Sequence, residues 1–116
     1  MQTDADTQDF HCPIEATLSV IGGKWTPLVL WHLRDETLRF GELRRKIPDI
    51  TKKMLSQRLQ ELEDEGLIHR EAYAEVPPRV EYSLTEFGQT LRPVLESMCE
   101  WGNTYLDHAA ESGLEG

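Results

Sequence analysis

Hydrophobic residues near the start of the chain recur at the spacing of a helix. Ile14, Leu18 and Ile21 stand four and three positions apart, after Pro13 and before two consecutive glycines. Residues at this spacing share one helix face, while proline suits a first helical turn and glycine favours the end of a helix. The pattern therefore predicts a short first helix.

The next segment, residues 25–33, is apolar at most of its positions. Leu30 and Trp31 add apolar side chains beside those that follow the helical repeat. One neighbouring element cannot cover so wide an apolar face. We expect this second helix either to lie at the centre of the fold or to be shared with a partner chain.

Two further helical patterns are separated by a short turn. Residues 40–47 have helical spacing that ends at Pro48, and Thr51 is suited to cap a following helix that reaches Glu65. Gly66 stands where a left-handed residue commonly ends a helix. The buried stripe of this fourth helix is predicted to be Leu55, Leu59 and Leu62. Together the two patterns predict a helix-turn-helix.

The chain then changes from helical to alternating spacing. Residues 68–73 and 79–84 alternate apolar and polar side chains around a tip that contains two prolines, which predicts a β-hairpin. Thr85 is suited to cap a long last helix, in which Pro93 predicts a kink or a restart. The fold class expected from this order is mainly α with a small β-hairpin wing, a winged helix-turn-helix.

Length and composition fit one domain. The 116 residues are 39% hydrophobic, enough for one modest core. We expect a flexible acidic leader at residues 1–11, the winged helix-turn-helix at 12–107 and a flexible tail at 108–116.

No segment is apolar over a length that would span a bilayer, and the start does not resemble an export signal. Cys12 and Cys99 form no framework of the secreted kind, so we expect a cytoplasmic protein without membrane contact.

The charge distribution changes what the net charge of −9 suggests. An average this acidic argues against a nucleic-acid partner. Residues 34–58, however, carry eight Lys or Arg against four carboxylates, whereas the segments on either side are acidic. A local basic block can draw DNA to one face of an acidic protein.

This basic block coincides with the helix-turn-helix. On a helical wheel, much of the face away from the leucine stripe carries Lys53, Ser56, Gln57 and Gln60, and the residues expected to read DNA are Lys52, Lys53, Ser56 and Gln57. Such side chains contact base edges and phosphates when a helix enters the major groove. The alternative is that they are ordinary solvated residues of an amphipathic helix. The full set of candidate DNA-binding residues is Lys52, Lys53, Ser56, Gln57, Arg58, Arg44 and Arg79.

The sequence offers no pattern typical of an enzyme or a metal site. Its four histidines are dispersed, and no Ser-His-Asp or Cys-His arrangement follows from their spacing. The consecutive carboxylates at the end of the fourth helix would scatter around it, so they are expected to form a solvated acidic end that points away from DNA. We expect no catalysis, no cofactor and no metal.

Several spaced motifs together resemble the HxlR-type transcriptional regulators, relatives of the MarR group, over about residues 12–106. They are CPIEATL at 12–18, IGGKW at 21–25, LWHL at 30–33, RFGELRR at 39–45, ITKKMLSQRLQELEDEG at 50–66 and EVPPRVEYSLT at 75–85, followed by Gly88. The resemblance implies a homodimer built by the first and last helices. It also implies a recognition helix at residues 51–65 and a wing at 68–84.

The two cysteines have different expected roles. Some members of this family sense electrophiles or oxidants through the cysteine that Cys12 matches, while others carry it with no sensing role established. Cys12 directly precedes the first helix, whose N-terminus would favour a thiolate, so it is a candidate redox sensor or, alternatively, a buried residue at a dimer contact. Cys99 is expected to be a packed small hydrophobe.

The expected function is a homodimeric, DNA-binding regulator on a pseudo-palindromic operator, with recognition helices about one turn, roughly 10 bp, apart. The expected partners are double-stranded DNA and a second copy of the chain, with no effector identified. The alternative is a winged-helix module that binds other proteins.

Arg79 could contact DNA from the wing or pair with Glu81 or another carboxylate, and both interpretations stay open.

Overall fold

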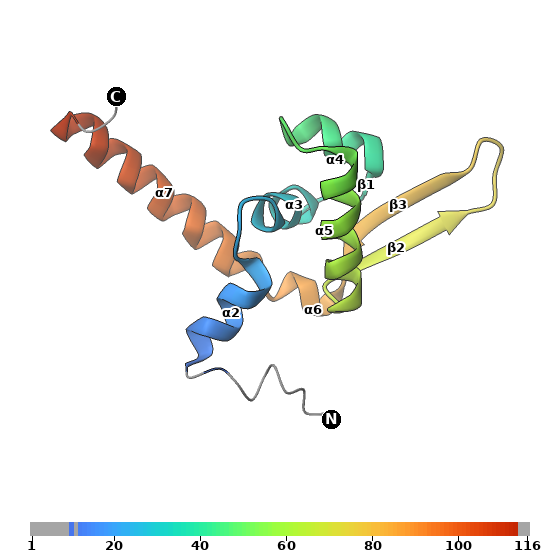
Figure 1. The fold of residues 1–116 in the computed structure, drawn as a ribbon, viewed down its shortest axis with the longest axis horizontal. Helices are drawn as coiled ribbons and strands as arrows, with labels where there is room; N and C mark the ends of the chain where they lie inside the picture. Colours follow the sequence, from blue (N-terminus) through green and yellow to red (C-terminus); the bar gives the residue numbers. More distant parts are fainter. Residues whose placement is uncertain (1–9, 11, 114–116) are drawn as a thin grey trace.

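The computed structural model describes residue 10 and residues 12–113, so the expected leader, apart from Phe10, lies outside the described residues. Within them, the last helix extends away from a body of helices on one side, and a long hairpin extends on the other (Figure 1). The elements in chain order are α2 (Pro13–Ile21), α3 (Thr26–Leu33), β1 (Leu38–Arg39), α4 (Phe40–Lys46), α5 (Lys52–Asp64), β2 (Ile68–Tyr73), β3 (Arg79–Leu84), α6 (Glu86–Gln89) and α7 (Arg92–Ser112). This order confirms the winged helix-turn-helix.

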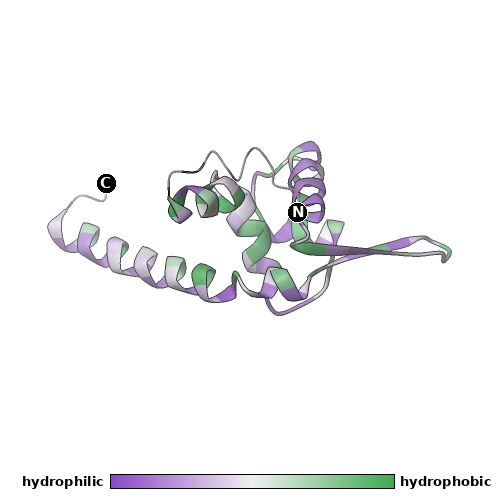
Figure 2. Cartoon of the chain, turned by 90° about the horizontal axis from the view of Figure 1, so that it is seen from below, coloured by the Kyte–Doolittle hydropathy of each residue, from purple (hydrophilic) through white to green (hydrophobic). Residues whose placement is uncertain are grey.

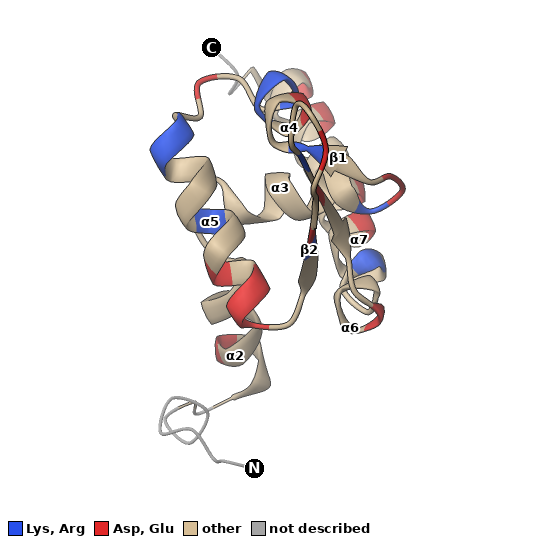
Figure 3. Ribbon diagram, turned by 90° about the vertical axis from the view of Figure 1, so that its right-hand side faces the viewer, with Lys and Arg blue, Asp and Glu red and all other residues tan. Residues whose placement is uncertain are grey.

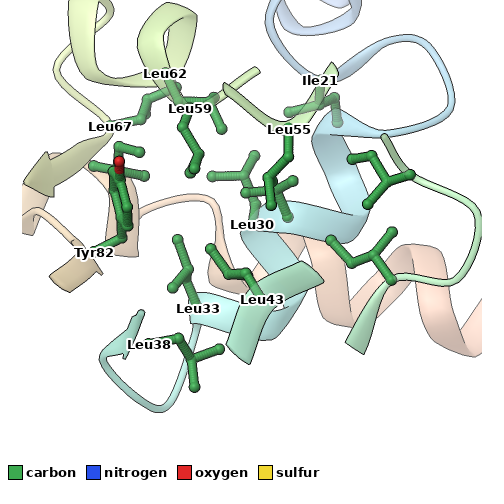
Figure 4. Packing of buried hydrophobic residues seen from close by; sticks show 14 of the residues in the cluster. Ile21, Leu30, Leu33, Leu38, Leu43, Leu55, Leu59, Leu62, Leu67 and Tyr82 are labelled. Atoms are coloured by element: carbon green, nitrogen blue, oxygen red, sulfur yellow. The ribbon is translucent and has the colours of Figure 1, made fainter. Parts of the chain in front are cut away.

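Helix α3 forms the centre of the core. Val29 and Leu30 are completely buried, and side chains from α4 and α5 converge on Leu30 and its neighbour Leu33 (Figure 4). The central position for this helix, one of the two expected from its apolar face, is therefore confirmed. The leucine stripe of α5 is buried as predicted: Leu55, Leu59 and Leu62 are each at most 2% exposed.

The recognition-helix candidate α5 is delimited at both ends by the residues that the sequence indicated. Its N-cap Thr51 accepts a hydrogen bond at Oγ1 from the Met54 N–H at 3.0 Å, which satisfies one of the free donors of the first turn. At the other end, Gly66 adopts a φ of 78°, and the Leu67 N–H donates to the Leu62 carbonyl at 2.9 Å. This left-handed glycine turns the chain into the hairpin.

The sheet has three strands rather than the two expected. Strands β2 and β3 pair antiparallel with Ile68 opposite Leu84, and they have the predicted bounds. The additional strand, β1, is only two residues long and pairs antiparallel with β3, with Leu38 opposite Tyr82, which gives the order β1-β3-β2. It joins the base of the wing to the start of α4.

The last part of the chain restarts at Pro93, one of the two outcomes expected there. Helix α6 ends at Gln89, and α7 begins at Arg92 with the proline in its first turn. Helix α7 continues to Ser112, so the expectation of a flexible tail from residue 108 is wrong for residues 108–112, which are helical. Among the described residues, no helix is long and apolar enough to cross a membrane.

Candidate DNA interface

Helix α5 presents the predicted polar face to solvent. Lys52, Lys53, Ser56 and Gln57 are all exposed, whereas the leucines of the same helix are buried. Lysines lie toward the N-terminal end of the helix and carboxylates toward its C-terminal end (Figure 3). A helix with donors at its N-terminal end can insert that end between phosphates, because the acidic end then points away from DNA.

The end of α4 adds basic residues beside this face. A groove of about 520 Å³ separates α4 from the start of α5, and Arg44, Arg45 and Lys52 are among the residues that line it. Arg44 Nε donates to the Ile50 carbonyl at 3.3 Å, so this guanidinium is tied to the turn. Arg45 was not among the predicted DNA-binding residues, although it stands next to Arg44 in the basic block.

Arg58 lies at the edge of the polar face rather than within it. Its side chain is 29% exposed, and Nε lies 3.4 Å from Oε1 of Glu61, one turn further along α5. Arg58 is therefore directed partly toward the acidic end of the helix.

Arg79 is paired within the wing. Its guanidinium carbon lies 3.8 Å from the centre of the Tyr73 ring, Nη2 donates to Glu75 at 2.7 Å, and Nη1 donates to Glu81. The hydrogen bond from Arg79 lowers the pKa of Glu75, and the two carboxylates raise the pKa of Arg79. The structure thus shows the carboxylate pairing that was one of the two interpretations for this residue.

Both cysteines are free thiols on the surface of the chain. Cys12 is the N-cap of α2, and its Sγ accepts a hydrogen bond from the Ile14 N–H at 3.4 Å. Cys99 is also exposed, so the expectation of a packed hydrophobe is wrong. It lines an apolar pocket of about 270 Å³ between α3 and α7, together with Leu28 and Trp31.

Apolar side chains gather on the surfaces of α2 and α7. On α2, Ile14 is 67% exposed and Leu18 58%. Along α7, green hydrophobic segments recur on the ribbon (Figure 2), and its exposed apolar residues are Val94, Met98, Trp101, Tyr105 and Leu106. Exposure of this many large apolar side chains typically marks an interface.

Elsewhere in the part of the chain that the structure describes, no group of His, Cys, Asp and Glu is arranged to hold a metal. The chemistry available at the helix-turn-helix is hydrogen bonding and charge pairing by Lys, Arg, Ser and Gln side chains. These groups suit recognition of a polyanion with base edges.

The chain matches known proteins over most of its length. The family model for HxlR-like helix-turn-helix proteins matches residues 20–110. The HTH-type transcriptional regulator YdeP of Bacillus subtilis is 54% identical over 105 residues, which cover 90% of this chain and 82% of the relative.

Two solved structures extend the comparison to three dimensions. The redox regulator HypR in its reduced form is 51% identical, covers 86% of this chain and 99% of its own, and has a TM-score of 0.81. The transcriptional regulator YodB from B. subtilis, also in reduced form, is 37% identical, covers 83% of this chain and 95% of its own, and has a TM-score of 0.71. With its helix-turn-helix, wing and polar α5 face, the chain belongs to the HxlR-like helix-turn-helix family of transcriptional regulators.

Proposed function

We propose that this regulator binds double-stranded DNA as a homodimer, with α5 of each subunit in a major groove. The observation that carries the proposal is the exposed Lys, Ser and Gln face of α5, which follows the basic last turn of α4 and ends in carboxylates. Ser56 and Gln57 are assigned to base edges, while Lys52, Lys53 and Arg44 are assigned to phosphates. This charge distribution favours DNA over the alternative of a protein-binding winged helix.

Two arginines have conditional roles in this proposal. Arg58 would reach DNA by leaving Glu61 for a phosphate. Arg79 would do so only by exchanging Glu75 for a phosphate, because its guanidinium is already paired within the wing. We therefore assign most of the binding free energy to α5 and the turn before it rather than to the wing.

The proposal is tested by selecting duplexes that the protein binds from a random DNA library. A dimer with two recognition helices should select an inverted repeat whose half-sites are centred about one turn, roughly 10 bp, apart. Selection of a single half-site, or of no common sequence, would contradict the proposed mode of binding.

The exposed apolar surface of α2 and α7 supports the homodimer. Trp101 is 66% exposed and stacks at a tilt on Tyr105, with ring centres 5.7 Å apart. Large aromatic side chains contribute strongly to interfaces when they are buried. We expect Trp101→Glu to convert a dimer into a monomer in analytical sedimentation, because the charge would have to be desolvated at the interface.

The matched control for this change is Val76→Glu. Val76 is fully exposed at the wing tip, away from α7, so the same substitution type should leave the dimer intact. A wild-type protein that stays monomeric at micromolar concentration and on DNA would contradict the homodimer.

We also propose that Cys12 makes the regulator responsive to oxidants or electrophiles. Its thiol is exposed at the start of α2, whose apolar face is part of the proposed dimer surface. An adduct or an intersubunit disulfide at this place would alter how the subunits meet. Two proteins of similar structure support this proposal. HypR is described as a redox regulator, and YodB has been solved after treatment with diamide.

The prediction is that diamide or a quinone changes the DNA affinity of the wild-type protein but not that of Cys12→Ser. Cys99→Ser is the matched control, since it removes the other free thiol and should respond like the wild-type protein. If the wild-type and Cys12→Ser proteins respond equally, or if neither responds, Cys12 has no sensing role.

A further inference from the structure

Arg92, the first residue of α7, joins this helix to the C-terminal end of α3. Its Nη1 donates to the Arg34 carbonyl at 2.8 Å, and its Nη2 donates to the Asp35 carboxylate. The side chain of Gln89 approaches the same Arg34 carbonyl, at 3.5 Å. None of these contacts belongs to the α5 face or to the exposed apolar surface of α7.

The positive charge of Arg92 interacts favourably with the dipole of α3 and unfavourably with the dipole of its own helix, α7. A cation at a helix N-terminus opposes the helix dipole, whereas a cation at a C-terminus complements it. Arg92 stands at the N-terminus of α7 and at the C-terminus of α3, with Glu96 one turn along α7 at 3.3 Å from its Nε. The hydrogen bond to Asp35 raises the pKa of Arg92.

These contacts lie where α7 leaves the body of the protein. Leu95, in the first turns of α7, is only 3% exposed, but Met98, Trp101 and Tyr105 beyond it are exposed. Figure 1 shows α7 extending away from the other elements after this base. The packing of Leu95 and the bonds that Arg92 makes to the end of α3 are therefore among the contacts that hold the base of α7 against the body.

A small rotation at this base would have a large effect at the other end. A helix of 21 residues is about 30 Å long, so a rotation of about 10° moves its far end by roughly 5 Å. This distance exceeds the rise of one base pair, about 3.4 Å. Since α5 packs on α3, the same rotation would move the recognition helix of one subunit relative to that of its partner.

We propose that Arg92 is a positioning residue that fixes the angle between α7 and the winged-helix body, and thereby the distance between the two recognition helices of the dimer. The inference rests on the proposed dimeric DNA-binding function. The side chains of Arg92 and Asp35 are 37% and 53% exposed, and ion pairs this accessible contribute little to stability. We therefore expect Arg92→Gln to leave the folding of the winged-helix body largely unchanged, so that an effect on the angle of α7 can be measured separately.

The first test measures the distance between recognition helices without DNA. Spin labels are placed at Gln57→Cys in a Cys12→Ser, Cys99→Ser background, and the intersubunit distance is measured by double electron–electron resonance. With Arg92 present, we expect one narrow distribution of distances between the labels. In Arg92→Gln, this distribution should broaden or shift by several ångströms, about one base-pair rise. The control Glu96→Gln removes the partner on α7 and should leave the distribution narrow.

The second test uses the duplex selected by the wild-type protein and the same duplex with one base pair inserted between its half-sites. The wild-type protein should prefer the original spacing by about tenfold, and Arg92→Gln should reduce this preference to about threefold or less. Asp35→Asn, which alters the other partner, should have the same effect and provides a second variant if Arg92→Gln does not fold.

The outcomes separate this inference from the proposed function. A wild-type protein that forms no dimer or selects no duplex overturns the proposed function, and this inference with it. If the wild-type protein binds with a spacing preference that both variants retain, only the role of Arg92 is overturned. A uniform loss of affinity at both spacings, with a lower unfolding temperature, would make Arg92 merely structural and also overturns the inference.

Discussion

The Gly88→Ala variant is expected to unfold at a much lower temperature than the wild-type protein. A Cβ on Gly88 would lie 2.0 Å from the Leu67 carbonyl oxygen and 3.1 Å from its carbon. These are backbone atoms at the start of the wing, and the same oxygen accepts a hydrogen bond from the Thr85 N–H at 3.0 Å. Neither partner can rotate aside, so α6 must move away from the strand base.

The free energy of unfolding is expected to fall by about 3 kcal/mol, which is the upper part of the range for overpacked cores. For a domain of this size, that corresponds to a fall in unfolding temperature of roughly 10 °C or more. Gly41→Ala is the matched control, because its Cβ would meet only the flexible Arg45 side chain, at 3.6 Å, and alanine favours a helix. Equal unfolding temperatures for the two variants would show that α6 and the strand base are not tightly apposed.

Gln57→Ala and Lys53→Ala are expected to weaken DNA binding in different ways. If Gln57 reads a base edge, its loss should reduce discrimination between selected and random duplex by about 1–3 kcal/mol. Because Lys53 is assigned to a phosphate, its loss should weaken binding to both duplexes and reduce the salt slope by about one unit. Titrations at several salt concentrations separate the two effects.

The control for both variants is Gln60→Ala. Gln60 is exposed on the same helix, but its Nε2 donates to Asp64 at 2.9 Å, at the acidic end that we expect to point away from DNA. Its removal should leave affinity and salt dependence unchanged. Unchanged binding in Gln57→Ala and Lys53→Ala as well would place the contact surface on another part of the protein.

The helices and the hairpin were predictable because their signals are local. The repeat of Leu55, Leu59 and Leu62 fixed the buried face of α5, and Thr51 and Gly66 marked its ends. Strand β1 was missed because two residues are too short to show alternation. The extent of α7 was underestimated, although Gly113, with a φ of 76°, was a usable stop signal.

The features that the sequence did not predict depend on contacts between distant residues. The exposure of Cys99 follows from where α7 leaves the body, which its spacing from Leu95 does not reveal. The pairing of Arg92 with Asp35 joins residues that are 57 positions apart. Arg79 differs from these two cases, because carboxylate pairing was one of its two interpretations from the sequence. In the free chain, the hairpin tip brings Glu75 and Tyr73 against the guanidinium, and contact with DNA stays a prediction.

The central claim, that the basic start of α5 recognises specific DNA, is tested most directly by the affinity of the wild-type protein for two duplexes. One is the duplex selected from a random library, and the other is a scrambled duplex of equal length and composition, each measured at low and near-physiological salt. We predict at least about a thousandfold preference for the selected duplex near physiological salt, and affinity for both that falls as salt rises. Equal and weak affinity for the two duplexes at both salt concentrations would contradict the claim.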